Sequence, residues 1–206
     1  MSDAHTLSTE ADVRAIIGEE LPVVRAKLFQ ELDDTARAFI ARSPMLLLAT
    51  ASADGMPDVS PKGDGPGFVA VEPDGTLLIP ERPGNKLIMS LKNLLVNPRV
   101  AMIFVVPGTE ETFRVQGSAE LTRDPAVLDR LAARGKPALL AIRVRVETCF
   151  FHCAKAFKRS KLWQPDTWSE RIKVSFGKLL APKLGGGADL EKTIDDMLEE
   201  DYRDNL

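Results

Sequence analysis

The residues best suited to chemistry lie in a short turn between an apolar run and a helical pattern. The stretch IPERPGNKLIM brings Arg82, Asn85 and Lys86 close together around a proline and a glycine. At a helix N-terminus the first N–H groups are unpaired and the helix dipole favours an anion. A guanidinium binds phosphate oxygens in pairs, and an ammonium adds a point charge. The turn therefore indicates a phosphate site, with a solvated surface turn as the alternative.

A second polar stretch, PDVSPKGDGPG, comes before this turn in the chain. A strand would place Ser60, Lys62 and Asp64 on one face, because side chains alternate with a period of two. Gly63 and the glycines after it would let a ligand approach the backbone. Such a face suits a flat heteroaromatic ring, and Lys62 would stabilise a reduced, anionic form of that ring. The alternative is the water-facing side of a half-buried strand.

The third candidate is CFFHCAKAFKRSKLW, which alternates aromatic residues with Lys155, Lys158, Arg159 and Lys161. It could be a nucleic-acid patch, a metal site, or a segment that crosses to a partner subunit and closes a ligand pocket. A net charge of -3 gives little support to nucleic-acid binding. The sequence holds 2 histidines, too few for the usual zinc site, so we expect no metal.

Composition and absent motifs narrow the class of protein. The 206 residues are 44% hydrophobic and 28% charged, which is ordinary globular composition. The apolar runs 45–51 and 101–106 are far shorter than the roughly 20 residues of a membrane span, and the N-terminus does not resemble a secretory signal. Phosphate-binding P-loop and dinucleotide fingerprints are missing. We expect a cytoplasmic protein that binds neither membranes nor nucleic acid.

The elements that would position these residues are mostly strands. Residues 12–41 have a helical pattern, with Pro22 dividing two helices. Three strand pairs follow, at 43–63, 68–80 and 99–121, and a seventh strand covers 138–151. Helices are expected from Leu87 to Val96 and over 124–135. Because curling removes exposed edges, the sequence predicts a mainly β fold, a partly open barrel with peripheral helices.

Three blocks of the sequence, in this order, resemble the FMN-binding family related to pyridoxamine 5'-phosphate oxidase. They are LLLATASADGMPDVSPKGDGPGFVAV, TLLIPERPGNKLIMSLKNLLVNPRVAMIFVVPGTEETFRVQGSAEL and FFHCAKAFKRSKLW. The resemblance implies a split β-barrel that forms a homodimer, with FMN at the subunit interface. The resemblance covers about residues 35–170. We expect a helical extension (1–42), an FMN-binding barrel (43–170) and a C-terminal tail (171–206).

The resemblance also assigns roles to residues of this sequence. It implies a phosphate site at Arg82, Asn85 and Lys86. It places the isoalloxazine ring along Val59, Ser60, Lys62 and Gly63. A cover from the other subunit would come from Lys155, Arg159 and Trp163.

The function implied is that of an FMN-dependent oxidoreductase acting on an unidentified small molecule. The arginine–histidine substrate signature of the vitamin-pathway oxidase is not reproduced in AFKRSKLW, so pyridoxamine phosphate is not the expected substrate. No catalytic side chain is identified, because a flavin itself carries the redox chemistry. The alternatives are a non-catalytic flavin-binding protein, for storage or sensing, and a deazaflavin-dependent reductase.

Overall fold

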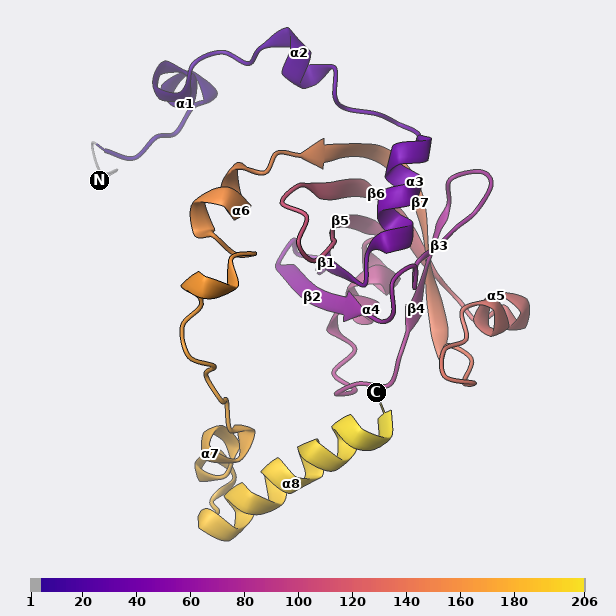
Figure 1. Ribbon diagram of the computed structural model, residues 1–206, viewed down its shortest axis with the longest axis vertical. Helices are drawn as coiled ribbons and strands as arrows, with labels where there is room; N and C mark the ends of the chain where they lie inside the picture. Colours follow the sequence, from indigo (N-terminus) through magenta and orange to yellow (C-terminus); the bar gives the residue numbers. More distant parts are fainter. Residues whose placement is uncertain (1–4, 206) are drawn as a thin grey trace.

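The computed structural model describes residues 5–205, and its centre is a curled sheet of seven antiparallel strands (Figure 1). The spatial order is β2-β1-β5-β6-β7-β4-β3. The strands are β1 (Met45–Ala51), β2 (Pro57–Gly63), β3 (Ala70–Val71), β4 (Leu77–Glu81), β5 (Arg99–Val105), β6 (Thr112–Thr122) and β7 (Leu140–His152). This confirms the predicted fold class, a half-open barrel with helices at its periphery.

The three predicted strand pairs are confirmed by the register of the sheet. In β1–β2, Ala51 pairs with Pro57, and in β3–β4, Val71 pairs with Leu77. The second turn is closed by Asp74, whose carboxylate accepts the N–H of Thr76. Turn residues with a short polar side chain or no side chain thus fix each register, as expected for hairpins.

A bulge between Gln116 and Gly117 interrupts the long β6–β7 ladder. At Gly117 the backbone approaches β7 so closely that an added Cβ would lie 2.0 Å from the carbonyl oxygen of Arg145. Only glycine fits there without a shift of the backbone. Because bulges bend a strand and increase its twist, this position helps the sheet to curl.

The barrel interior is filled by alternate residues of the strands. In β1 the side chains of Leu46 and Leu48 are completely buried, as the period of two requires. Phe104 and Phe113 are buried beside them, and Phe113 and Phe151 pack with ring centroids 4.9 Å apart. This apolar interior holds the strands that carry the candidate site.

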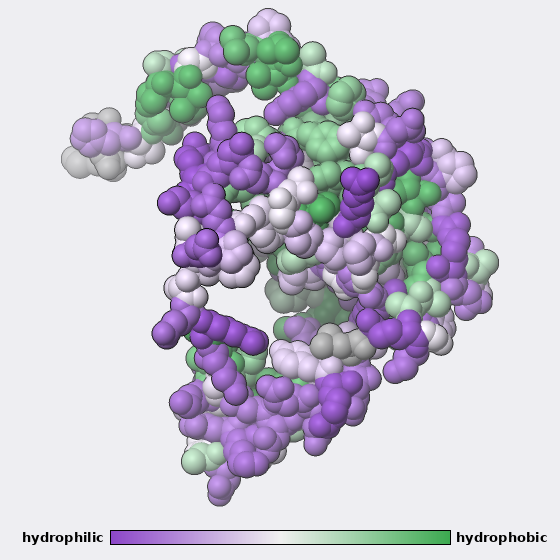
Figure 2. Space-filling view, viewed as in Figure 1, coloured by the Kyte–Doolittle hydropathy of each residue, from purple (hydrophilic) through white to green (hydrophobic). Residues whose placement is uncertain are grey.

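Three helices, not two, precede the barrel: α1 (Glu10–Ile17), α2 (Pro22–Arg25) and α3 (Asp34–Arg42). The helical pattern predicted over 12–41 is therefore wrong for residues 18–21 and 26–33. In the second stretch, Phe29 pairs through its backbone with Cys149 of β7. Helix α3 packs Ala36 and Ile40 into the core, whereas α1 and α2 bury no residue. Figure 2 shows hydrophobic side chains gathered over α1 and α2.

The other helices lie outside the sheet or beyond it. Helix α4 (Met89–Val96) lies beside β1 and β2, and α5 (Pro125–Arg130) covers part of β7. Helix α5 ends before the predicted Gly135, which lies in a tight turn where Ala133 pairs with Lys136. After β7 come α6 (Lys155–Ser160), η1 (Pro165–Thr167), α7 (Phe176–Leu180), η2 (Pro182–Leu184) and α8 (Ala188–Asn205).

The C-terminal segment folds on itself as a helical pair. An added Cβ at Gly177 would lie 2.1 Å from the carbonyl oxygen of Glu191, so α7 and α8 are in direct backbone contact. Ser175 and the N–H of Gly177 both donate to the Asp195 carboxylate. The surface of this pair is mostly hydrophilic (Figure 2). Within residues 5–205, no helix is long and apolar enough to cross a membrane.

The two cysteines occupy opposite environments and neither forms a disulfide. Cys149 is buried in the core, where its thiol donates a weak hydrogen bond to the carbonyl oxygen of Glu31 at 3.4 Å. Burial, with a contribution from the charge of Asp33, raises the pKa of this thiol. Cys153 is exposed just after β7. The structural thiol is thus protected, whereas the second one faces water.

Candidate functional site

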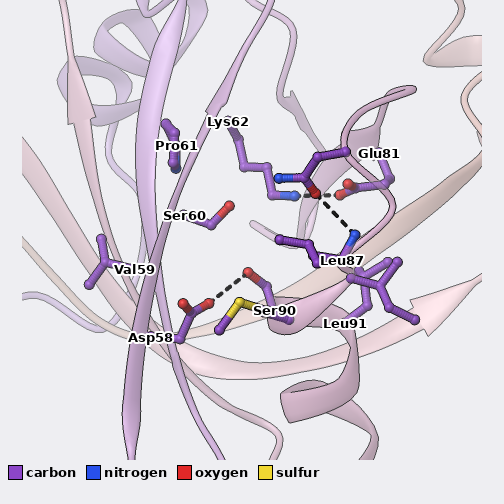
Figure 3. A pocket seen from close by; sticks show the side chains of 12 residues that line it. Asp58, Val59, Ser60, Pro61, Lys62, Glu81, Leu87, Ser90 and Leu91 are labelled. Atoms are coloured by element: carbon purple, nitrogen blue, oxygen red, sulfur yellow. Dashed lines mark hydrogen bonds and ion pairs between the residues drawn. The ribbon is translucent and has the colours of Figure 1, made fainter. Parts of the chain in front are cut away.

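A cavity of about 250 Å³ opens between β2, the end of β4 and the start of α4 (Figure 3). One wall is formed by residues 58–62 of β2, and the opposite wall is the turn that leads into α4. Its lining residues are Asp58, Val59, Ser60, Pro61, Lys62, Glu81, Asn85, Leu87, Ile88, Met89, Ser90 and Leu91. Two stretches singled out from the sequence, the polar strand and the turn, therefore meet in one cavity.

Helix α4 begins at Met89, two residues later than expected from the sequence. Lys86 and Ile88 have φ angles of 61° and 49°, a left-handed backbone that is strained for residues other than glycine. Ile88 is the N-cap residue, and no side chain caps the helix. The first-turn N–H groups thus lack an intrahelical acceptor beside the cavity.

The turn before α4 is held by local hydrogen bonds. The side-chain oxygen of Asn85 accepts the N–H of Leu87 at 3.0 Å. At the other end of the cavity, Ser90 donates to the Asp58 carboxylate at 3.2 Å. Sequence reasoning did not identify Asp58 or Ser90 as site residues, although the spacing of Asp58 from Ser60 and Lys62 put it on the same face of β2.

Lys62 forms an ion pair across the cavity with Glu81, the last residue of β4 (Figure 3). Its Nζ lies 2.6 Å from Glu81 Oε2, and the two side chains are only 14% and 21% exposed. Glu81 was also not identified from the sequence, where it reads simply as a charged residue after an apolar run. Its role depends on a contact between distant strands, which no local pattern reveals.

Arg82 faces a different cavity, lined by the loop after β2 and the end of α5. Its Nε donates to Asp64 at 2.9 Å, and an Nη donates to the carbonyl oxygen of Leu131 at 2.8 Å. Arg134 also contacts Asp64, at 3.3 Å. Burial opposes ionisation of Asp64, but the Gly65 N–H and both guanidinium groups outweigh it, so its pKa lies below the ordinary value.

The polar face predicted for Ser60, Lys62 and Asp64 is therefore split. Strand β2 ends at Gly63, and Asp64 lies beyond it in the second cavity, while Ser60 and Lys62 stay in the first. Gly63 itself packs against the chain, since an added Cβ would lie 3.1 Å from the carbonyl oxygen of Pro44. Val59, on the other face of the strand, is exposed at the rim.

The pairs Lys62–Glu81 and Arg82–Asp64 connect opposite sides of the curled sheet. Strand β2 is one edge, and β4 lies next to the other edge strand, β3. Since the two strands are not neighbours in the sheet, these side chains meet only because it curls. The last residue of β4 thus binds Lys62 near the end of β2, and the residue after β4 binds Asp64 just beyond β2.

The basic aromatic segment lies at another end of the barrel within one subunit. Trp163 donates its indole N–H to the carbonyl oxygen of Thr109 at 2.8 Å and stacks on Phe157. Lys158 contacts Glu110 at 3.3 Å. Lys155 and Arg159 are exposed, and none of these residues lines the cavity beside α4. Their predicted role as a cover from a second subunit stays a prediction.

Comparison with known proteins agrees with this architecture. The family model for pyridoxamine 5'-phosphate oxidase matches residues 32–153, and the chain belongs to this family. Solved structures similar to this chain also include a protein described as FAD-binding from Mesorhizobium loti, 19% identical with a TM-score of 0.41, and an F420 reductase, 22% identical with a TM-score of 0.43. No curated protein matches the sequence.

Three solved structures illustrate the structural similarity. HupZ of Group A Streptococcus is 19% identical, with a TM-score of 0.48, over 58% of this chain and 98% of that one. A putative pyridoxamine 5'-phosphate oxidase from Lactobacillus delbrueckii is 25% identical, with a TM-score of 0.45, over 59% and 95%. HutZ of Vibrio cholerae, a haem storage protein, is 19% identical, with a TM-score of 0.39, over 58% and 94%.

Proposed function

We propose that this protein binds FMN in the cavity between β2 and α4 and acts as an FMN-dependent oxidoreductase on a small molecule. The observation that carries the proposal is the uncapped start of α4, which lies in the same cavity as the polar face of β2. A phosphate would accept the free N–H groups there, near Asn85 and Lys86. The ring would lie along Val59, Ser60 and Lys62.

The backbone conformation and the side-chain chemistry of the cavity are compatible with a flavin phosphate ligand. The strained backbone at Lys86 and Ile88 presents the helix start to the cavity, and strain of this kind clusters at ligand sites. The wall of β2 offers an ammonium and a hydroxyl at Lys62 and Ser60, and Leu87 adds apolar surface. A bound flavin would supply hydride transfer, while the chain supplies binding and electrostatics.

A homodimer is the assembly that we propose for the bound state. The rim of the cavity exposes Val59, Leu87, Ile88 and Met89, which are large apolar side chains. A second subunit that covers them would also enclose a ligand that is open to water in one subunit. The basic segment with Lys155, Arg159 and Trp163 is the candidate cover from that subunit.

The first experiment compares the binding of FMN and riboflavin to the purified protein by visible absorption and titration. Hydrogen bonds to charged groups contribute about 1.5–3 kcal/mol each. Asn85→Ala with Lys86→Ala removes two such contacts and should therefore weaken FMN binding by roughly 100-fold or more. Riboflavin, which lacks the phosphate, should bind wild type and variant almost equally.

The matched control is Lys92→Ala, which removes an exposed cation of α4 that does not line the cavity. It should leave both affinities unchanged. Wild-type protein that takes up neither flavin would refute the proposed cofactor, and stronger binding of a deazaflavin would favour the reductase alternative. Tight FMN binding without turnover with reduced nicotinamides and a panel of acceptors would favour storage or sensing over catalysis.

A further inference from the structure

The ion pair of Lys62 and Glu81 places a carboxylate against the cation at the proposed flavin site, and flavin binding alone does not explain this carboxylate. Both side chains reach into the cavity from strands on opposite sides of the sheet and meet at 2.6 Å (Figure 3). Neither contacts any other charged group within residues 5–205. The positive charge beside the proposed ring site is therefore matched by one specific carboxylate.

The charges of the cavity wall show what this carboxylate changes. Of the described residues that line the cavity, Lys62 is the one cation, while Asp58 and Glu81 are anions. Asp58 is held at the other end by Ser90, so it does not compete for Lys62. With Glu81 in place, the net charge at the Lys62 end of the cavity is close to zero. Without it, the same end would carry an uncompensated positive charge.

We propose that Glu81 is a positioning residue that holds Lys62 at the flavin and cancels its charge, so that the reduced flavin receives little electrostatic stabilisation from Lys62. The inference rests on the proposed function, because it concerns a flavin bound in this cavity. A reduced flavin is anionic when N1 is deprotonated, and a nearby cation stabilises that form. A carboxylate in contact with the cation weakens this effect by the same Coulomb interaction.

The proposal predicts opposite effects from the two partners. Glu81→Gln keeps a side chain of the same size and leaves the Lys62 charge uncompensated, so the midpoint potential of bound flavin should rise. Lys62→Met keeps an unbranched side chain and leaves the Glu81 charge alone, so the potential should fall. The double variant Lys62→Met/Glu81→Gln removes both charges and should return close to the wild-type potential.

Sulfite binding gives a second readout that does not depend on turnover. Sulfite adds reversibly to oxidised flavin and leaves negative charge on the ring, so a nearby cation strengthens its binding. We expect the sulfite Kd to be about tenfold lower in Glu81→Gln and about tenfold higher in Lys62→Met, which corresponds to roughly 1.4 kcal/mol in each direction. Glu120→Gln is the matched control, because its pair with Arg143 is exposed and outside the cavity.

Several results would overturn the inference. If Glu81 and Lys62 only support the fold, both single variants should bind flavin more weakly, and their potentials should not move in opposite directions. If Lys62 lies at the phosphate, the opposite effects should appear in the FMN Kd and not in the potential. Wild-type protein that binds no flavin would instead refute the proposed function, so the two failures are distinguishable.

Discussion

The two ion pairs that join β2 to β4 differ in what surrounds them. Arg82 and Asp64 are 19% and 9% exposed, and they are joined by Arg134, the Gly65 N–H and a backbone carbonyl. Lys62 and Glu81 are nearly as buried but have only each other, beside an open cavity. The first pair belongs to a connected network that fixes loops, whereas the second is available to a ligand.

This difference changes the interpretation of the arginine in the turn. The sequence places Arg82 beside Asn85 and Lys86, which suggests a shared role at a phosphate. In the structure its guanidinium is held in the neighbouring cavity by Asp64 and by the carbonyl oxygen of Leu131. We therefore expect Asp64 and Arg82 to contribute to the free energy of unfolding, and Lys62 to contribute to the properties of a bound ligand.

The largest effect is expected from Asp64→Ala. It leaves Arg82 without its carboxylate partner and removes the contact with Arg134. Breaking a buried pair by removing one partner costs about 3–5 kcal/mol, and partial exposure puts this site near the lower end. Urea denaturation should show a loss of about 3 kcal/mol in the free energy of unfolding. Glu120→Ala, which breaks the exposed pair with Arg143, should cost less than about 1 kcal/mol.

A smaller loss of stability is expected from Arg82→Ala, about 2 kcal/mol, because Asp64 keeps Arg134 and the Gly65 N–H as partners. If Arg82 is structural, the folded variant should bind FMN and riboflavin with affinities close to those of wild type. A large, FMN-specific loss of affinity would show that Arg82 leaves Asp64 and binds the phosphate when the ligand arrives. That result would show that both ion pairs, and not only Lys62–Glu81, are available to a ligand.

The smallest effect is the pH dependence of stability, measured as the difference in unfolding free energy between wild type and Asp64→Asn. The pKa of Asp64 is lower in the folded state than its ordinary value of 3.8, so below that value the unfolded state takes up the proton first. The stabilisation from the carboxylate is complete above the unfolded pKa and is lost as pH falls through the folded pKa. The difference in unfolding free energy should be constant above about pH 5 and shrink in more acidic buffer. A difference that is constant throughout would contradict this.

The sequence predicted those parts of the fold that local patterns determine. Alternating apolar residues placed the seven strands, and short turn signals such as Asp74-Gly75 placed the hairpins. The start of α4 was placed two residues early, because Leu87 and Ile88 continue its apolar spacing although both are exposed outside the helix. Spacing alone does not show that the backbone before Met89 is left-handed.

The candidate site was predicted in part, for a similar reason. Ser60, Lys62 and Asn85 were placed on the right elements, and the structure brings them to one cavity. Glu81 and the separation of Asp64 from Lys62 depend on how the sheet curls, which brings together strands far apart in its order. Such contacts join residues that neither period nor spacing relates, so they were visible only in the folded chain.

Because one cysteine is buried and the other is exposed, thiol labelling of this chain can report its unfolding. The buried, high-pKa thiol of Cys149 should resist alkylation while the core is intact, whereas Cys153 is open to reagent. A maleimide should therefore add one label to the native chain and two once the core opens. Mass spectrometry of the labelled chain would then count native and open molecules directly, without any coloured cofactor.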